Sequence, residues 1–207
     1  AETVGFDAFL ESGGAVGPEE FDARVAAVTP DDLCHLMFTS GTTGQPKGVM
    51  LEHGAVCRGF ESWCDVIGLR AGDRYLVVNP YFHSFGLNAG ILACLMRGAT
   101  NLPHAVFDVP AIMQRIADDR ITVLPGPPAI YQSMLQHPDL DPSKLASLRL
   151  AVTGAAVIPV QLIVDMRETL GFDTVVTGYG LTESSGIATM CRHDDDPTTI
   201  ATTSGRA

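Results

Sequence analysis

A loop rich in glycine and hydroxyl residues, from Thr39 to Gly48, carries the residue types that bind a polyphosphate. Glycines let the main chain approach an anion closely and point N–H groups at it. Hydroxyl groups donate hydrogen bonds to phosphate oxygens, and Lys47 adds a positive charge. Composition alone is equally consistent with a solvated surface turn, so the loop by itself predicts an anion site and names no ligand.

The loop differs from the Walker A loop of P-loop nucleotide hydrolases. That pattern requires Gly before the lysine and Ser or Thr after it, whereas here Pro46 precedes Lys47 and Gly48 follows it. The chain also continues into an apolar stretch with strand character, residues 48–51, and not into a helix. The sequence therefore disfavours a P-loop hydrolase and predicts that the loop connects two strands of a hairpin.

A second candidate segment, Gly178 to Glu183, follows a predicted strand at 174–177. Tyr179 offers a flat aromatic face to a base. Thr182 offers a hydroxyl group to an α-phosphate, and Glu183 offers a hard oxygen ligand to Mg²⁺, which typically binds one or two carboxylates together with phosphates. So short a string is also usual in an ordinary turn, so its weight depends on the other motifs.

Alternating strand and helix patterns position these segments. After residue 32, short apolar runs alternate with stretches of helical periodicity, which predicts an α/β fold with a largely parallel sheet flanked by helices. In such sheets the ligand lies at the carboxyl ends of the strands. The predicted strand ends, and therefore the predicted binding rim, are Thr39-Ser40, Asn79-Pro80, Pro125-Gly126, Thr153-Gly154 and Thr177-Gly178.

Composition excludes several classes of protein. The chain of 207 residues is 46% apolar and 18% charged, which is typical of a globular protein. A net charge of −11 disfavours broad contact with nucleic acid or an anionic membrane. No apolar run reaches the length of a membrane span, and the start lacks the features of a signal peptide. Five cysteines without a C-x-x-C pair favour a reducing, cytoplasmic location.

The string from Thr39 to Gly48 resembles the phosphate-loop signature of the adenylate-forming (AMP-binding) enzyme superfamily, which includes acyl-CoA synthetases. Three further segments are similar to motifs of the same family. Residues 178–183 resemble its Tyr-Gly-x-Thr-Glu motif, 153–156 its Gly-Ala loop, and 81–86 the aromatic and histidine segment that borders the acyl pocket. The resemblance spans residues 31–207 and implies a part of the family's large N-terminal domain.

The resemblance implies ATP-dependent activation of a carboxylic acid to an acyl-AMP, followed by transfer to coenzyme A as co-substrate. It implies catalytic roles for His83, Thr182 and Glu183, and a Mg²⁺ site at Glu183 with Thr39. The residues that it assigns to ATP are Thr39, Ser40, Gly41, Thr42, Thr43, Gly44, Lys47, Gly154, Ala155, Ala156, Gly178, Tyr179, Gly180 and Thr182.

The residue at position 83 indicates the kind of acid. Family members that activate amino acids usually place an aspartate there to pair with the α-amino group, whereas this chain has His83 and no carboxylate in 79–88. A free ammonium would lack its counter-charge, so we expect an acid without an amino group. Two alternatives remain: an acyl-AMP ligase that loads a carrier protein, and a non-catalytic nucleotide-binding module with a flavodoxin-like sheet.

The resemblance also predicts how the chain is divided. Residues 1–32 are expected to link to an N-terminal part that is missing, and 33–207 to form the ATP- and acyl-binding α/β subdomain. The family's mobile C-terminal catalytic domain would lie beyond residue 207, so we expect the chain to be an excised fragment that does not complete adenylation alone. The polar end, 194–207, is expected to lack a closing element.

Overall fold

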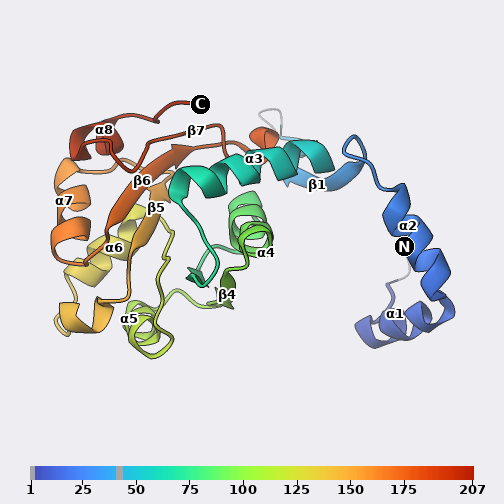
Figure 1. Ribbon diagram of the computed structural model, residues 1–207, viewed down its shortest axis with the longest axis horizontal. Coiled ribbons are helices and arrows are strands. Elements are labelled where there is room, and N and C mark those ends of the chain that lie inside the picture. The colour runs from blue at the N-terminus through green and yellow to red at the C-terminus, as the bar shows by residue number, and fades with distance from the viewer. Residues whose placement is uncertain (1–2, 41–43) are drawn as a thin grey trace.

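A computed structural model describes residues 3–40 and 44–207. The protein is an α/β structure with a central sheet, a separate two-stranded hairpin and an N-terminal pair of helices (Figure 1). The strands are β1 (Leu33–Thr39), β2 (Lys47–Glu52), β3 (Arg74–Val77), β4 (Thr100–Pro103), β5 (Leu150–Gly154), β6 (Thr174–Tyr179) and β7 (Thr189–Met190).

The central sheet has the order β4-β3-β5-β6-β7, with the segment around Val123 between β3 and β5. Parallel ladders join β3 to β4 and β5 to β6, whereas β7 pairs antiparallel with β6. Val123 forms single parallel bridges to Tyr75 and to Leu150. The predicted strand at 121–124 is therefore reduced to a bridge; Pro125 has no N–H group to donate toward β3, although the Gly126 amide still donates to the Val152 carbonyl of β5 at 3.0 Å. The prediction of a largely parallel sheet is confirmed.

Helices cover both faces of this sheet. Figure 1 shows α6 and α7 on one side of β5 and β6, with α3 on the other. The helices are α3 (His53–Ile67), α4 (Ala93–Arg97), α5 (Val109–Asp118), α6 (Pro128–Leu135), α7 (Val160–Glu168) and α8 (Pro197–Thr202), the π-helix η2 (Phe85–Leu92), and the single 3₁₀ turns η3 (Pro142–Leu145) and η4 (Thr182–Ser184). Among the described residues, no helix is long and apolar enough to cross a membrane.

The core follows from the twofold alternation of strand side chains. On β5, Ala151 joins the buried cluster under α5, α6 and α7, whereas Leu150 and Val152 join the cluster under α3 and α4. On β6, Val175 and Val176 divide in the same way. Both faces of the sheet are therefore buried, which leaves its edges and strand ends to bind ligands.

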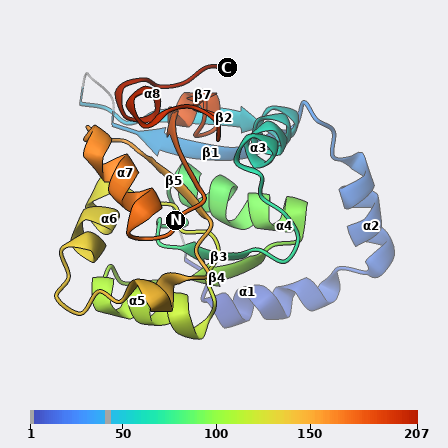
Figure 2. The ribbon, with the colours of Figure 1, turned by 60° about the vertical axis from the view of Figure 1, so that its left-hand side comes forward.

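The β1–β2 hairpin lies beside the start of α3 (Figure 2). Its strands pair antiparallel with Thr39 opposite Lys47, so the phosphate-type loop connects two strands as predicted. Gly41, Thr42 and Thr43 lie outside the described residues.

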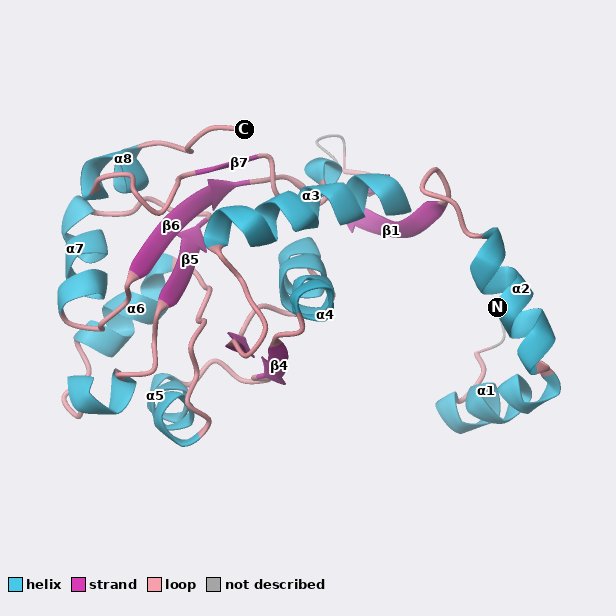
Figure 3. Ribbon diagram, viewed as in Figure 1, coloured by secondary structure: helices cyan, strands magenta, loops and turns pink. Residues whose placement is uncertain are grey.

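The N-terminal arm contains α1 (Phe6–Ser12), the 3₁₀ turn η1 (Gly13–Ala15) and α2 (Pro18–Ala27). It extends away from the sheet (Figure 3). Residues 3 to 32 are all exposed. The division into 1–32 and 33–207 remains a prediction.

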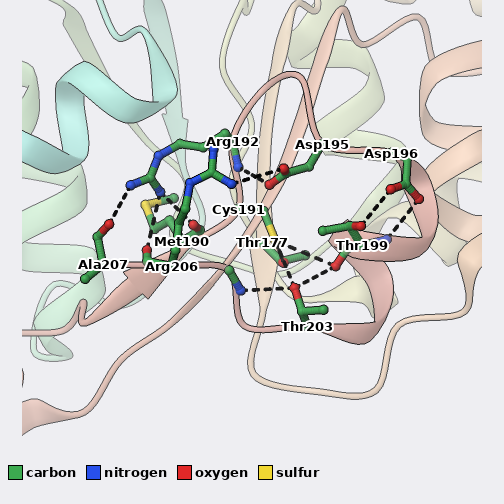
Figure 4. A network of polar contacts seen from close by, with 11 residues as sticks. Thr177, Met190, Cys191, Arg192, Asp195, Asp196, Thr199, Thr203, Arg206 and Ala207 are labelled. Carbon is green, nitrogen blue, oxygen red and sulfur yellow. Dashed lines mark hydrogen bonds and ion pairs between the residues drawn. The ribbon is translucent and has the colours of Figure 1, made fainter.

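The C-terminal segment is more ordered than expected. Helix α8 begins at Pro197, and the Asp196 side chain caps it by accepting hydrogen bonds from the amides of Thr198 and Thr199 at 2.8 and 3.1 Å (Figure 4). The Arg192 guanidinium donates to the carbonyl oxygens of Met190 and Ala207, at 2.6 and 2.9 Å. The expectation of no closing element was wrong, because the cap and the proline in the first turn start a helix.

Candidate functional site

A pocket of about 430 Å³ opens at the carboxyl edge of the central sheet. Every predicted strand end except Thr39-Ser40 contributes at least one residue to it, so these strand ends meet around one pocket. Its lining consists of Asn79, Pro80, Phe82, His83, Phe85, Gly126, Pro127, Val152, Thr153, Gly154, Ala155, Gly178, Tyr179, Gly180, Gly186 and Ile187.

His83 is held by the backbone at one ring nitrogen. The Phe85 amide donates a hydrogen bond to His83 Nδ1 at 3.1 Å, and the His83 amide donates to the Pro80 carbonyl at 3.0 Å. Because Nδ1 accepts in this arrangement, the proton of a neutral imidazole lies on Nε2. His83 therefore lines the pocket with Nε2 as a hydrogen-bond donor suited to a carboxylate or phosphate oxygen.

One side of the pocket is apolar. Pro80, Phe82 and Phe85 follow β3, and Val152 and Ile187 complete this wall. Phe85 packs edge-on against buried Trp63, with ring centroids 6.1 Å apart, whereas Phe82 is 89% exposed at the mouth. An apolar wall beside a single hydrogen-bonding histidine suits the hydrocarbon part of an acid.

Glycine backbone also lines the pocket. Gly154 has φ +157°, and a Cβ built on it would lie 2.8 Å from the Gly178 carbonyl oxygen. A Cβ on Gly180 would lie 2.1 Å from the carbonyl oxygen of Gly186, well inside van der Waals contact. The next residue after Gly154, Ala155, has φ +61°. These close approaches require glycine at positions 154 and 180, because any side chain there would meet neighbouring backbone.

The described residues that are predicted to bind phosphate and Mg²⁺, on the β1–β2 hairpin and on η4, do not line this pocket, whereas Tyr179 does. Tyr179 ends β6 with its side chain 49% exposed, and the chain then turns into η4, which contains Thr182 and Glu183. The turn η4 lies next to β2, the strand that begins at exposed Lys47. Lys47 and Glu183 thus belong to neighbouring elements at the same end of the molecule.

The structure sorts the predicted site residues into groups. It brings together His83, Gly154, Ala155, and the run from Gly178 to Gly180 in one pocket. Ala156 follows next in the chain and is exposed. Thr39, Ser40, Gly44 and Lys47 lie on the hairpin, and Thr182 and Glu183 lie on η4.

Sequence reasoning missed part of the lining. Asn79 and Gly126 were named only as strand ends, and Gly186 and Ile187 were not named. Ser185 adopts the left-handed φ of +62°, and this turn brings Gly186 and Ile187 back to the pocket. A serine in the sequence does not indicate a left-handed turn, so this return could not be predicted.

The carboxylates suit a metal ion that arrives with a nucleotide better than a resident one. Across residues 3–40 and 44–207, no group of three His, Cys, Asp or Glu side chains converges as metal ligands. Asp195 and Asp196, near Cys191 and His193, are engaged instead with Arg206 and with the start of α8. Mg²⁺ typically takes one or two protein carboxylates and completes its shell with phosphates and water, so a lone Glu183 fits that donor set.

The fold is that of the N-terminal domain of adenylate-forming enzymes, as the comparisons with known proteins show. The chain belongs to the AMP-binding enzyme family, whose profile matches residues 3–207. It is 52% identical over 202 residues to a 3-[(3aS,4S,7aS)-7a-methyl-1,5-dioxo-octahydro-1H-inden-4-yl]propanoyl:CoA ligase of Rhodococcus jostii, covering 98% of this chain and 39% of the relative. A ligase of the same name from Mycobacterium tuberculosis is 50% identical, with 97% and 39% covered.

Solved structures agree with this assignment. The inhibitor-bound N-terminal domain of FACL13 from Mycobacterium tuberculosis matches with a TM-score of 0.76 and 31% identity, over 93% of this chain and 50% of that one. ATP-bound MatB from Rhodopseudomonas palustris matches with a TM-score of 0.74 and 28% identity, over 86% and 34%. The chain thus spans about 39% of the length of the two CoA ligases that it matches.

Proposed function

We propose that the protein acts in the ATP-dependent activation of a carboxylic acid and its transfer to coenzyme A. In the first step a carboxylate oxygen attacks the α-phosphorus of ATP, and the bond to pyrophosphate breaks. In the second step the CoA sulfur attacks the acyl carbonyl, and AMP leaves with the bonding electron pair. The observation that carries the proposal is that one pocket is lined by His83, by apolar side chains and by glycine backbone.

The side chains have distinct roles in this proposal. The loop from Thr39 to Gly44 and Lys47 bind the β- and γ-phosphates, through N–H groups, hydroxyls and one positive charge. Tyr179 and the backbone at 154–156 hold the adenine, and Thr182 donates to the α-phosphate. His83 donates from Nε2 to the acid carboxylate or to the phosphate oxygen that gains charge, which lowers the barrier by positioning and charge stabilisation.

Mg²⁺ fits the same site. Glu183, with Thr39, would hold the ion against the phosphates, where it would neutralise their charge. The donor chemistry of an exposed carboxylate beside β2 supports this role.

The proposed acid is bulky, apolar and free of an amino group. No carboxylate stands in 79–88 to pair with an ammonium, and the wall around His83 is made of Phe82, Phe85, Val152 and Ile187. The two ligases that share about half of this sequence are named for a propanoate on a methyl-substituted, dioxo bicyclic ring system. We propose that the substrate acid is a bicyclic propanoate of this kind, whose rings pack against these apolar side chains.

A stable acyl-adenylate analogue tests the proposal. Calorimetry would compare AMP with sulfamoyl-adenosine conjugates of that bicyclic propanoate and of an α-amino acid. We expect the propanoate conjugate to bind at least about a hundredfold more tightly than AMP, because both halves are engaged together. Equal affinity for conjugate and AMP would instead indicate a nucleotide-binding module, and preference for the aminoacyl conjugate would overturn the assigned acid class.

Two turnover measurements then separate the steps, made on a chain in which these 207 residues are joined to the C-terminal domain that the family resemblance implies. Acid-dependent exchange of labelled pyrophosphate into ATP reports adenylation, and AMP release that requires CoA reports thiol transfer. Release that requires an acyl carrier protein and ignores CoA would favour the carrier-loading alternative.

A further inference from the structure

The helix that follows His83 is not an ordinary α-helix. Residues 85–92 form the π-helix η2 before α4 begins at Ala93, and the Ala93 amide donates to the carbonyl of Asn88, five residues earlier. Gly86 sits so close to β3's end that a Cβ there would lie 2.0 Å from the Pro80 carbonyl oxygen. Widened turns of this kind are uncommon and often accompany functional sites.

One polar side chain on η2 is buried and reaches across the site. Asn88 is 2% exposed, and its Nδ2 donates a hydrogen bond to the Ser185 carbonyl oxygen at 3.0 Å. Ser185 itself is 5% exposed and lies 97 residues further along the chain. The bond therefore joins the segment that carries His83 and Phe85 to the segment that carries Tyr179, Thr182 and Glu183.

The carbonyl that Asn88 binds belongs to the turn that closes η4. Ser185 has φ +62°, its amide donates to Thr182 at 3.0 Å, and the Gly186 amide donates to Leu181 at 2.8 Å. Gly186 also approaches η2, since a Cβ on it would lie 3.2 Å from Ser84 Oγ. A left-handed serine is unfavourable on its own, so an external hydrogen bond helps to hold the turn.

We propose that Asn88 is a positioning residue that fixes η4 relative to the His83 segment, so that the acid side and the nucleotide side of the pocket are ordered together. The inference rests on the proposed function for its consequence, which is positive coupling between acid and ATP binding. Asn88 acts through the Ser185 carbonyl and the turn at 184–186, and Glu183 and Thr182 keep their orientation toward β2 because that turn is held.

Asn101 provides a matched control. It lies on β4, and its Nδ2 donates to the Gly90 carbonyl, also at 3.0 Å and also on η2. Replacing either asparagine removes an amide-to-carbonyl hydrogen bond from the same π-helix. Asn88→Ala removes the hydrogen bond to the Ser185 carbonyl, in the turn after η4. Asn101→Ala removes the hydrogen bond to the Gly90 carbonyl and also the hydrogen bond that the Tyr81 hydroxyl donates to Asn101.

Hydrogen exchange tests the positioning role without any ligand. In Asn88→Ala we expect the amides of Ser185 and Gly186 to exchange at least about tenfold faster than in the unaltered protein. In Asn101→Ala we expect their rates to follow only the change in global stability, measured by urea unfolding. Equal acceleration in both variants would overturn the proposal. If Asn88→Ala does not fold, Asn88→Ser replaces it, and unfolding of that variant while Asn101→Ala stays folded would also contradict the proposal.

Calorimetry then tests the consequence with ATP–Mg²⁺ and the bicyclic propanoate. We expect the acid to tighten ATP binding several-fold in the unaltered protein and in Asn101→Ala, and the factor to fall towards one in Asn88→Ala. Full coupling in Asn88→Ala would overturn the inference. An unaltered protein that binds neither ligand would overturn the proposed function instead, and the exchange rates would still decide the role of Asn88.

Discussion

Arg149 and Asp73 form a buried ion pair that ties the beginning of β5 to the beginning of β3, although 76 residues separate them. Asp73 is 3% exposed and also accepts hydrogen bonds from Thr122 Oγ1 and from the Arg70 amide, both at 2.9 Å. This cluster lies at the amino ends of the strands, at the edge opposite the pocket. The ion pair and its hydrogen bonds therefore link the strands at one edge of the sheet, and the pocket lies at the opposite edge.

Removing the Asp73 charge should therefore affect stability and spare ligand binding. Asp73→Asn leaves the Arg149 guanidinium largely buried without its partner, and breaking such a pair costs about 3–5 kcal/mol. Urea unfolding measures the loss of unfolding free energy. Asp118→Asn is the control, because Asp118 is exposed and loses only its contacts with Gln114. We expect its unfolding free energy to change by no more than about 0.5 kcal/mol. A loss below about 1 kcal/mol for Asp73→Asn would contradict the assignment.

The same carboxylate makes stability depend on acid pH. Burial acts to raise the pKa of Asp73, but hydrogen bonds from Arg149, the Arg70 amide and Thr122 outweigh it, so the net pKa lies below 3.8. A lowered pKa contributes stability that is fully present above 3.8 and is lost as pH falls below it. We expect the unfolding free energy of the unaltered protein to drop more steeply below pH 4 than that of Asp73→Asn, measured by urea titration at each pH.

The chain has only two lysines, which makes the phosphate role of Lys47 straightforward to test. Lys47→Met should weaken ATP binding about 10- to 100-fold, the loss expected when a charge-assisted contact is removed. Lys144→Met removes the same charge from the η3 turn, where Lys144 lies 4.0 Å from Asp141, and should leave ATP affinity within about twofold. Calorimetry compares the ATP affinities of the two variants. An equal loss of affinity in both would mean that the change in net charge, and not a contact of Lys47, weakens ATP binding.

The two nitrogens of His83 can be distinguished by amide substitutions. The His83→Asn amide oxygen stands near Nδ1 and can still accept from the Phe85 amide, whereas the longer His83→Gln amide reaches toward Nε2. If Nε2 contacts the acid, Gln should retain at least about tenfold more affinity for the acyl-adenylate analogue than Asn. The reverse order would place the functional contact at Nδ1.

Gly180 should not tolerate a side chain. An added Cβ would meet the Gly186 carbonyl, so Gly180→Ala must displace backbone, at a cost of about 1–3 kcal/mol and with weaker analogue binding. Gly59 in α3 is the control, because no described atom lies within 4 Å of a Cβ built there. Gly59→Ala should be neutral or stabilise the helix by about 0.5–1 kcal/mol, and calorimetry with thermal unfolding compares the two.

Much of the site follows from the sequence because parallel strands end at one edge. The runs after β3, β5 and β6 could be assigned to a common rim from local patterns alone, and the pocket contains residues from each. The antiparallel hairpin also followed from the apolar run after Gly48, and the family membership followed from the motifs.

The remainder depends on contacts between distant segments. Nothing local to Asn88 indicates that it binds a carbonyl 97 residues away, and nothing local to Ser185 indicates a left-handed turn. The bridge at Val123 was read as a full strand because its apolar run resembles one, although the neighbouring prolines limit pairing. Helix α8 is different, since Asp196 before Pro197 is a local start signal that the sequence analysis overlooked.

The close approaches at Gly154 and Gly180 mean that part of the pocket is lined by main chain and not by side chains. A surface of main chain can change little by substitution, whereas Phe82, Phe85, Val152 and Ile187 can each be exchanged for a larger or smaller residue. Variation in the shape of this pocket therefore comes mainly from these side chains. On the proposed function, exchanges at these four positions would change which acid is bound while the glycine backbone stays in place.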